Sequence, residues 1–230
     1  MKQLIIAGNW KSNKTVSEAG VWMKAFAPHI LSIKDTLRES IPLVCAPFLD
    51  LNVMSSVKKE LSLPVEIGAQ DVSPFPEGAY TGEVSARMIK ELCSWVIIGH
   101  SERRKLLGEK EDELFNEAKQ AKAAGLKVIY CVSDELMAIP PDVDVIGYEP
   151  TWAIGTGKTD TPENANKTVQ KFKDKTGIRL AVYGGSITAD NVTDFVRQPA
   201  IDGVLVGGAS LDPEKFFTLI VNALKVNANG

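Results

Sequence analysis

The feature that most constrains the fold is a set of eight short, apolar and mostly β-branched runs spread along the chain. They occupy residues 4–7, 43–46, 65–69, 95–98, 128–131, 145–148, 180–183 and 204–206. Apolar residues follow one another in these runs rather than alternating with polar residues, which is typical of strands buried on both faces of a parallel sheet. The sequence therefore predicts eight buried parallel strands.

Amphipathic segments separate the runs and predict helices. They cover residues 16–26, 51–59, 84–92, 113–124, 162–173, 191–197 and 213–225. Thr161-Pro162 and Asp212-Pro213 each place an N-cap residue before a proline at the first helical position. Because strand and helix alternate eight times, we expect an α/β barrel that spans residues 1–230 as a single domain. An open, doubly wound sheet is the structural alternative.

One connection is too short for a full helix. Between Cys131 and Glu149 lie the breaker Ile139-Pro140-Pro141 and the sixth strand itself. This leaves room for about two helical turns, so the fifth outer helix should be nearly absent.

Composition excludes several classes of function. The 230 residues carry a net charge of −3 and a sequence pI near 5.6, which argues against nucleic acid or an anionic membrane as the main partner. Cys45, Cys93 and Cys131 have neither metal-ligand spacing nor the even count of a disulfide framework. No apolar run approaches the ~18 residues of a membrane span, and the first run is too short for a signal peptide. We expect a cytoplasmic protein.

Glu149 directly follows the sixth run and precedes a proline and a glycine-punctuated loop. In a barrel, the carboxyl-terminal ends of the strands meet at one mouth, where active sites are built. A carboxylate that is held by a strand and covered by a loop able to hinge suits a general base working away from water. Taken alone, a Glu-Pro pair in this position is more typical of a surface residue at a strand end.

Glycines after the last two runs predict a phosphate site. Gly184-Gly185-Ser186 and Gly207-Gly208 lie where backbone N–H groups can approach an anion closely, and a helix follows each of them. Barrels often bind phosphate at these two loops. Tight turns without a ligand are the alternative. Lys11, just beyond the first run, is a candidate charge clamp beside the phosphate.

His100 ends the fourth run and precedes a predicted helix start. A helix N-terminus disfavours the imidazolium, so His100 can stay neutral and donate a hydrogen bond to a carbonyl oxygen. A buried core histidine is the alternative. The run Gly155-Thr156-Gly157-Lys158 is not a nucleotide-binding P-loop, because Trp152 occupies the position of the first glycine.

Five segments together resemble the triosephosphate isomerase family, and they extend in order over essentially the whole chain. They are Ala-Gly-Asn-Trp-Lys at 7–11, Gly-His-Ser-Glu-Arg-Arg at 99–104, Tyr-Glu-Pro-Thr-Trp-Ala-Ile-Gly-Thr-Gly at 148–157, Tyr-Gly-Gly-Ser at 183–186 and Leu-Val-Gly-Gly-Ala-Ser at 205–210. The resemblance implies a TIM barrel that interconverts dihydroxyacetone phosphate and D-glyceraldehyde 3-phosphate in glycolysis and gluconeogenesis. It implies neither a cofactor nor a metal.

The resemblance also assigns roles to individual residues. Glu149 would be the base, His100 the neutral electrophile, Lys11 the cation that offsets the charge of phosphate and intermediate, and Asn9 a hydrogen-bond donor to the oxyanion. The phosphate would be held by backbone N–H groups of Gly155, Ser186, Gly207 and Gly208. The supporting residues would be Glu102 near Lys11 and His100, and Ile154 and Leu205 against the base.

The long loop over residues 70–82 carries Phe75 and Tyr80 near its tip, where they would be poorly placed in water. In the similar family this loop inserts into a partner subunit, with the residue matching Thr81 near the partner's active site. We therefore expect a homodimer, and a self-packed loop is the alternative. The short fifth crossover, and Cys131-Val132-Ser133-Asp134 where the family usually has Cys-Ile-Gly-Glu, affect the outer surface, so a tetramer is possible.

Two other functions remain open at this point. A different barrel enzyme for a phosphorylated metabolite would keep the glycine loops, but would have no reason to combine Asn9, Lys11, His100 and Glu149. A non-catalytic binding barrel would be expected to lack the base or the loop that covers it.

Overall fold

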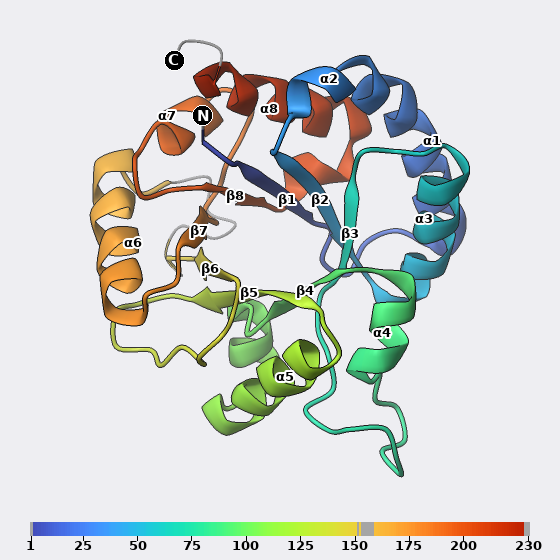
Figure 1. Ribbon diagram of the computed structural model, residues 1–230, viewed down its shortest axis with the longest axis vertical. Coiled ribbons are helices and arrows are strands. Elements are labelled where there is room, and N and C mark those ends of the chain that lie inside the picture. Colours follow the sequence, from blue (N-terminus) through green and yellow to red (C-terminus); the bar gives the residue numbers. More distant parts are fainter. Residues whose placement is uncertain (1, 151, 153–158, 228–230) are drawn as a thin grey trace.

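The computed structural model describes residues 2–150, 152 and 159–227. Eight parallel strands pair in chain order, and the eighth pairs with the first to close a barrel (Figure 1). The strands are β1 (Ile5–Asn9), β2 (Ile41–Ala46), β3 (Glu66–Ala69), β4 (Trp95–Ile98), β5 (Lys127–Val132), β6 (Val145–Tyr148), β7 (Leu180–Tyr183) and β8 (Gly203–Val206). The predicted barrel is confirmed, and the alternative of an open sheet is wrong.

Helices surround the barrel. They are α1 (Val16–Ser32), α2 (Lys34–Leu37), α3 (Phe48–Glu60), α4 (Ala86–Leu92), α5 (Glu111–Ala123), α6 (Pro162–Thr176), α7 (Val192–Val196) and α8 (Pro213–Leu224), with a π-helical turn η1 (Arg103–Leu107) and 3₁₀ turns η2 (Gly208–Leu211) and η3 (Lys225–Asn227). Both predicted caps are present. The Thr161 hydroxyl accepts the Asn164 N–H at 3.2 Å, and the Asp212 carboxylate accepts the Lys215 N–H at 2.9 Å. The sequence did not indicate α2 or η1.

The connection from β5 to β6 contains no helix. Residues 133–144, all of which the structure describes, form only turns and bends. Pro140 and Pro141 lack the backbone N–H that a helix would require. The prediction that the helix after the fifth strand is nearly absent is confirmed. Figure 1 shows an irregular segment in its place, between α5 and α6.

The strands are apolar on both faces because they contact two different cores. Alternate residues point into the barrel, where Ile129, Cys131 and Leu205 belong to one buried cluster. The residues between them, such as Val128 and Tyr130, belong to the cluster that joins the sheet to the helices. Both faces of each strand are therefore removed from water, which explains the continuous apolar runs.

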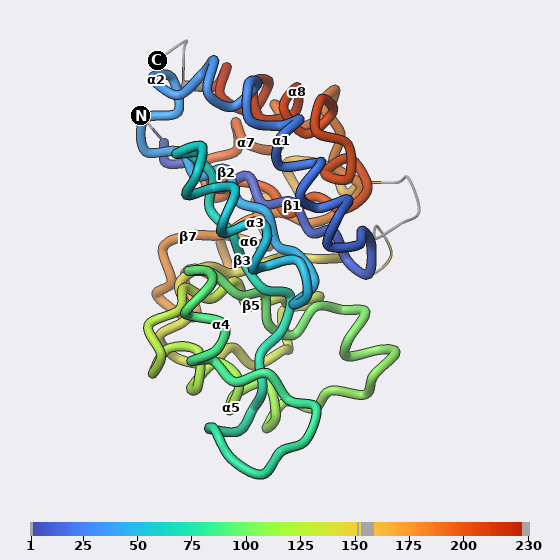
Figure 2. Tube along the Cα trace, turned by 90° about the vertical axis from the view of Figure 1, so that its right-hand side faces the viewer, coloured from blue at the N-terminus to red at the C-terminus, as the bar shows by residue number. Residues whose placement is uncertain are grey.

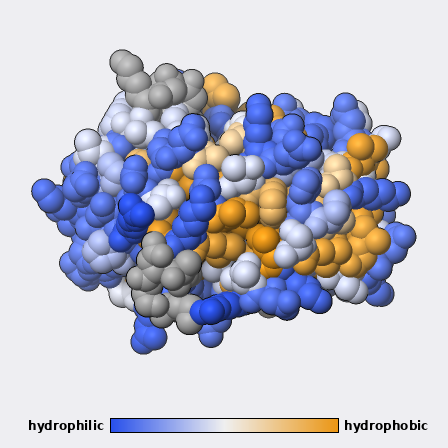
Figure 3. Space-filling view, turned by 90° about the horizontal axis from the view of Figure 1, so that it is seen from above, coloured by the Kyte–Doolittle hydropathy of each residue, from blue (hydrophilic) through white to orange (hydrophobic). Residues whose placement is uncertain are grey.

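Figure 3 views the molecule from the side of α2 and α8, where apolar residues gather among hydrophilic ones. On α2 and α8 lies a groove of about 700 Å³, lined in part by Leu37, Val221 and Leu224. Lys2 and Ser40, which precede β1 and β2, also line it, so the groove is at the amino-terminal end of the barrel. No helix in the described part of the chain is long and apolar enough to cross a lipid bilayer.

Two segments project from the barrel. The one after β3 is seen at the bottom of Figures 1 and 2, and the one after β4 at the right of Figure 2. In the first, the rings of Phe75 and Tyr80 stack with centroids 4.3 Å apart and an interplanar angle of 6°. The two side chains remain 43% and 40% exposed. Thr81 follows them and is also exposed. The loop tip thus packs its aromatic rings on each other without burying them.

Candidate active site

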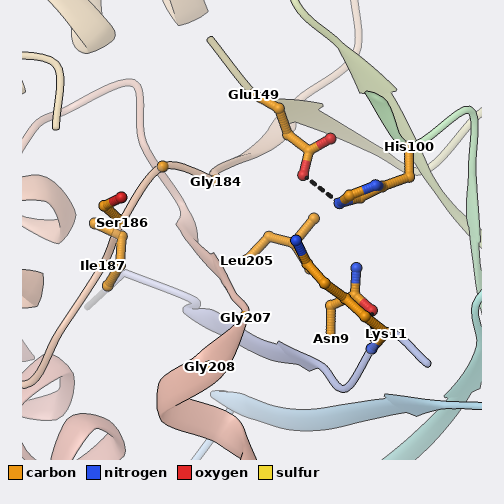
Figure 4. Close-up of a pocket in the computed structure, with 11 residues that line it drawn as sticks. Asn9, Lys11, His100, Glu149, Gly184, Ser186, Ile187, Leu205, Gly207 and Gly208 are labelled. Carbon is orange, nitrogen blue, oxygen red and sulfur yellow. Dashed lines mark hydrogen bonds and ion pairs between the residues drawn. The ribbon is translucent and has the colours of Figure 1, made fainter. Parts of the chain in front are cut away.

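A cavity of about 170 Å³ opens at the carboxyl-terminal ends of the strands (Figure 4). Its lining consists of Asn9, Lys11, His100, Glu149, Gly184, Gly185, Ser186, Ile187, Leu205, Gly207 and Gly208. The structure thus brings together the residues that the sequence placed after strands one, four, six, seven and eight. Of the other predicted residues, Glu102 and Thr81 are not in the lining. Ile154 and Gly155 lie outside the described residues.

Glu149 is held at the end of β6 by its own backbone, whose N–H donates to the Val132 carbonyl at 2.8 Å. The residue is only 3% exposed. Its Oε1 lies 3.0 Å from Nε2 of His100, and its Oε2 accepts the Ser101 N–H at 3.4 Å. The carboxylate is therefore almost completely buried, and the dashed line in Figure 4 marks its contact with the imidazole.

The protonation of His100 is defined by its two nitrogen contacts. Nδ1 accepts the backbone N–H of Glu102 at 3.2 Å, so Nδ1 carries no proton and Nε2 donates to Glu149. Burial lowers the pKa of His100, but the hydrogen bond and charge of Glu149, helped by Glu102, outweigh it and raise the pKa. That rise depends on an ionised Glu149. The backbone N–H of Glu102 that donates to Nδ1 favours the neutral form of His100 with its proton on Nε2.

Lys11 occupies a strained position at the rim of the cavity. Its φ of 54° lies in the left-handed region, which is uncommon for a residue other than glycine and tends to occur at functional sites. The Asn9 side-chain oxygen accepts the Lys11 N–H at 3.0 Å, and Lys11 Nζ forms an ion pair with Glu102. Asn9 and Glu102 therefore orient the lysine, although Glu102 itself does not line the cavity.

The glycine side of the cavity has room for an anion. A Cβ built on Gly208, at the start of η2, would meet no atom within 4 Å, and one on Gly207 would meet Lys11 Cε at 3.6 Å. Ser186 turns the chain after β7 with a φ of 49°. Backbone groups here face open space with a cation beside them, which is the arrangement that binds phosphate.

Arg104 makes structural contacts that the sequence did not indicate. Its Nε donates to the Gly99 carbonyl at 2.7 Å, and its terminal nitrogen donates to the Cys131 carbonyl at 3.1 Å. The guanidinium also lies over the Tyr130 ring, 5.4 Å from the centroid. Arg104 therefore ties the end of β4, directly before His100, to the end of β5. Two adjacent arginines in a sequence suggest only a charged surface, so the signal was weak.

A second missed contact lies beyond the covering loop. The Tyr183 hydroxyl accepts the Asp160 N–H at 2.9 Å, and the Asp160 carboxylate accepts the Asn164 amide at 2.8 Å. Both Tyr183 and Asp160 are buried. The chain is thus anchored to β7 and to the start of α6 just after residues 153–158.

The fold and this arrangement define a class of protein. A buried carboxylate and an imidazole contact each other in the lining of a small cavity, and a lysine and an anion-sized opening lie beside them. These groups are the ones that a barrel enzyme needs to transfer protons on a small anionic substrate.

The comparisons with known proteins identify the family. The family model described as triosephosphate isomerase matches residues 4–223. Triosephosphate isomerase of Mesomycoplasma hyopneumoniae (strain 232) is 39% identical over 246 aligned residues, covering 97% of this chain and all of the relative. Those of a Picosynechococcus species and of Thermus thermophilus are each 38% identical, covering 96% of this chain and 99% and 98% of the relatives. The chain belongs to the triosephosphate isomerase family.

Replacing Arg104 by methionine is expected to lower kcat by roughly tenfold to a hundredfold with little change in KM. Without the hydrogen bonds of Arg104 to the carbonyls of Gly99 and Cys131, the backbone directly before His100 would no longer hold the imidazole in its position. Steady-state kinetics alongside thermal unfolding measure this. Arg87→Met is the matched control, because the Arg87 side chain is 80% exposed and pairs only with Glu77 among the described residues. Unchanged kcat in Arg104→Met would remove the positioning role.

Proposed function

We propose that this chain interconverts dihydroxyacetone phosphate and D-glyceraldehyde 3-phosphate by proton transfer through an enediolate. The observation that carries the proposal is the 3.0 Å contact between Glu149 Oε1 and His100 Nε2 in a cavity whose other side is the open turn at Gly207 and Gly208. A triose phosphate needs both halves, because its carbon chain must reach the acid–base pair while its phosphate is bound.

In the proposed mechanism, Glu149 removes a proton from the carbon next to the carbonyl. The electron pair of that C–H bond forms the C=C bond of the enediolate, and the carbonyl oxygen gains negative charge. The Nε2–H of His100 stabilises this oxygen and passes protons between the two oxygens. Glu149 then returns its proton to the neighbouring carbon, so that no atom is gained or lost.

Lys11 and Asn9 would stabilise the negative charge of the intermediate, since the lysine lies beside Gly207 and both residues line the cavity. Backbone groups of Ser186, Gly207 and Gly208 would hold the phosphate, and Gly155 would join them from the covering loop. Leu205 would help keep the base dry. A Cβ on Gly184 would lie 3.1 Å from Glu149 Cγ and 3.4 Å from Leu205 Cβ, so these side chains converge at that glycine.

Exclusion of water serves two purposes in this reaction. A dry site strengthens the electrostatic contacts to the enediolate, and it also protects the intermediate, which readily expels phosphate in water. We propose that residues 150–158, with Ile154 pressing on the base, close over the substrate. The triosephosphate isomerase family is itself a standard example of such a lid and of a tuned base.

A coupled assay tests the function directly. Purified protein is given D-glyceraldehyde 3-phosphate without added metal or nucleotide, and formation of dihydroxyacetone phosphate is followed. Rapid turnover is the expected result. If folded protein binds the substrate but shows no turnover, the non-catalytic binding barrel becomes the better interpretation.

We further propose that residues 1–230 act as one cytoplasmic domain that forms a homodimer. The exposed Phe75 and Tyr80 rings support this, because a partner subunit would remove them from water and bring Thr81 toward its active site. Light scattering at low micromolar concentration is expected to give twice the mass of 24.9 kDa. A four-subunit mass would instead place a second contact on the surface thinned at residues 133–144, and a monomer would contradict the proposal.

A further inference from the structure

Three carboxylates meet outside the active site. Asp71 follows β3, Glu109 follows η1 and Glu117 lies on α5. One oxygen of each lies within 4.8 Å of an oxygen of the other two. The segments that carry Asp71 and Glu109 are those that project from the barrel in Figure 2. We call these residues the three-carboxylate cluster.

Arg103 satisfies part of the cluster. Its terminal nitrogen lies 2.6 Å from Oδ2 of Asp71, and its Nε forms an ion pair with Oε1 of Glu109. Arg103 does not engage the second oxygen of Asp71 or of Glu109. Asp71 Oδ1, Glu109 Oε2 and Glu117 Oε2 are all buried and have no hydrogen-bond partner among the described residues. Glu117 is only 3% exposed, so its unpartnered oxygen is well removed from water.

The charges of the cluster do not balance. Arg103 pairs with Asp71 and Glu109 but not with Glu117 among the ion pairs of the described residues, so two negative charges are left when all three carboxylates are ionised. The charge of Arg104 also acts on Glu109, but the Nε and one terminal nitrogen of Arg104 donate to the carbonyls of Gly99 and Cys131 rather than to the cluster. Buried carboxylates without partners are costly, because they lose hydration and gain nothing in exchange. A bound positive species would restore the balance.

We propose that Asp71, Glu109 and Glu117 form a binding site for one divalent cation of the oxygen-preferring class, with Ca²⁺ as the cation to test. Two oxygens on opposite sides of Ca²⁺ lie about 4.6–5.2 Å apart, since its bonds to oxygen are about 2.3–2.6 Å long. The ligand atoms of the cluster lie within 4.8 Å of one another, which is close enough for them to share one such ion. A charge of +2 cancels the excess.

The cation has a path to the site and would have a structural consequence. The Asp71 side chain is 18% exposed, so this residue lies between the solvent and the buried oxygens of the cluster. Water can supply the remaining ligands, as is usual for Ca²⁺. Once bound, the cation would join the loop after β3, the segment after η1 and α5. It would therefore stabilise the two segments that project from the barrel, at a distance from the proton-transfer site.

Protons are the competing occupants. Burial raises the pKa of Asp71 to about 7, although the charge of Arg103 opposes the rise. Burial, and then the charges of Asp71 and Glu109, raise the pKa of Glu117 to about 9. Burial also raises the pKa of Glu109 despite Arg103. Other charged groups acting on the cluster are Arg104, Glu83 and Glu113. Because these folded pKa values lie above the ordinary ones, the cation-free protein should lose stability as pH rises from about 5 to 9. Ca²⁺ must displace the protons, so it should bind more tightly at high pH.

Isothermal titration of chelator-treated wild-type protein with calcium chloride at pH 8 and pH 6 tests the site. One saturable event per chain is expected at pH 8, at least tenfold weaker at pH 6, with proton release that differs between buffers of different ionisation enthalpy. The midpoint of thermal unfolding at pH 8 should rise by several degrees with Ca²⁺ and fall back when a chelator is added.

Glu117→Gln should weaken the calcium event at least thirtyfold. Asp112→Asn is the matched control, because Asp112 is an exposed acid in the first turn of the same helix and lies outside the cluster. If Glu117→Gln does not fold, Asp71→Asn serves in its place. No saturable calcium binding, or binding that neither cluster variant weakens, would overturn the proposal and leave protons as the occupants.

Discussion

Replacing Glu149 by glutamine is expected to lower turnover by at least ~10³-fold, equivalent to roughly 4 kcal/mol of barrier. Glutamine has nearly the same size, and its side-chain oxygen can still accept the Nε2–H of His100, which lies 3.0 Å from Glu149 Oε1. It cannot take a proton from carbon. The coupled assay measures the fall in kcat.

A binding measurement distinguishes the loss of the base from damage to the cavity. Glu149→Gln should bind sn-glycerol 3-phosphate, which carries the phosphate but no carbonyl, within about threefold of wild type, because the turns at Ser186 and Gly207 are unchanged. Glu91→Gln is the matched control, since Glu91 is exposed on α4. Retained turnover in Glu149→Gln would show that another group is the base.

Gly203→Ala is expected to cost more than about 3 kcal/mol of the free energy of unfolding, or to prevent folding, which exceeds the usual range for an overpacked site. Gly203 begins β8 and pairs with Ile5 where the barrel closes. A Cβ at this position would lie 1.9 Å from the Ile5 carbonyl oxygen, and the φ of 153° is itself unfavourable for other residues. The clash is with backbone, so strands β1 and β8 would have to separate.

Denaturant unfolding followed by circular dichroism measures the effect. Gly208→Ala is the control, since a Cβ there meets no atom within 4 Å. Its free energy of unfolding should stay within about 1 kcal/mol of wild type. A Gly203→Ala protein that folds with an unchanged midpoint would contradict the account of barrel closure.

Much of the fold could be predicted because its signals are local. Runs that are apolar on every residue indicate strands buried on both faces, and Thr161-Pro162 and Asp212-Pro213 indicate helix starts. The prolines at 140 and 141 indicate that the connection between β5 and β6 lacks a helix. By contrast, α2 is four residues long, and η1 is a π-helical turn whose form depends on contacts made by its side chains, so neither leaves a periodic pattern.

The candidate site was predictable for a related reason. Parallel strands bring their carboxyl-terminal ends to one mouth, so Asn9, His100 and Glu149 could be placed together from their positions in the chain. The roles of Ile154, Gly155 and Thr81 stay predictions. The first two lie outside the described residues, and Thr81 would act in a partner subunit.

By itself, the sequence determined the order of strands and helices and the set of polar groups at the strand ends, because burial periodicity and capping act over a few residues. It predicted the barrel, and the pairing of β8 with β1 confirmed its closure. Only the tertiary structure decided the 3.0 Å contact of Glu149 with His100, the clamp made by Arg104 and the three-carboxylate cluster. These depend on side-chain distances between segments that are remote in the chain. Such distances are set by packing of the whole barrel, and no local pattern encodes them.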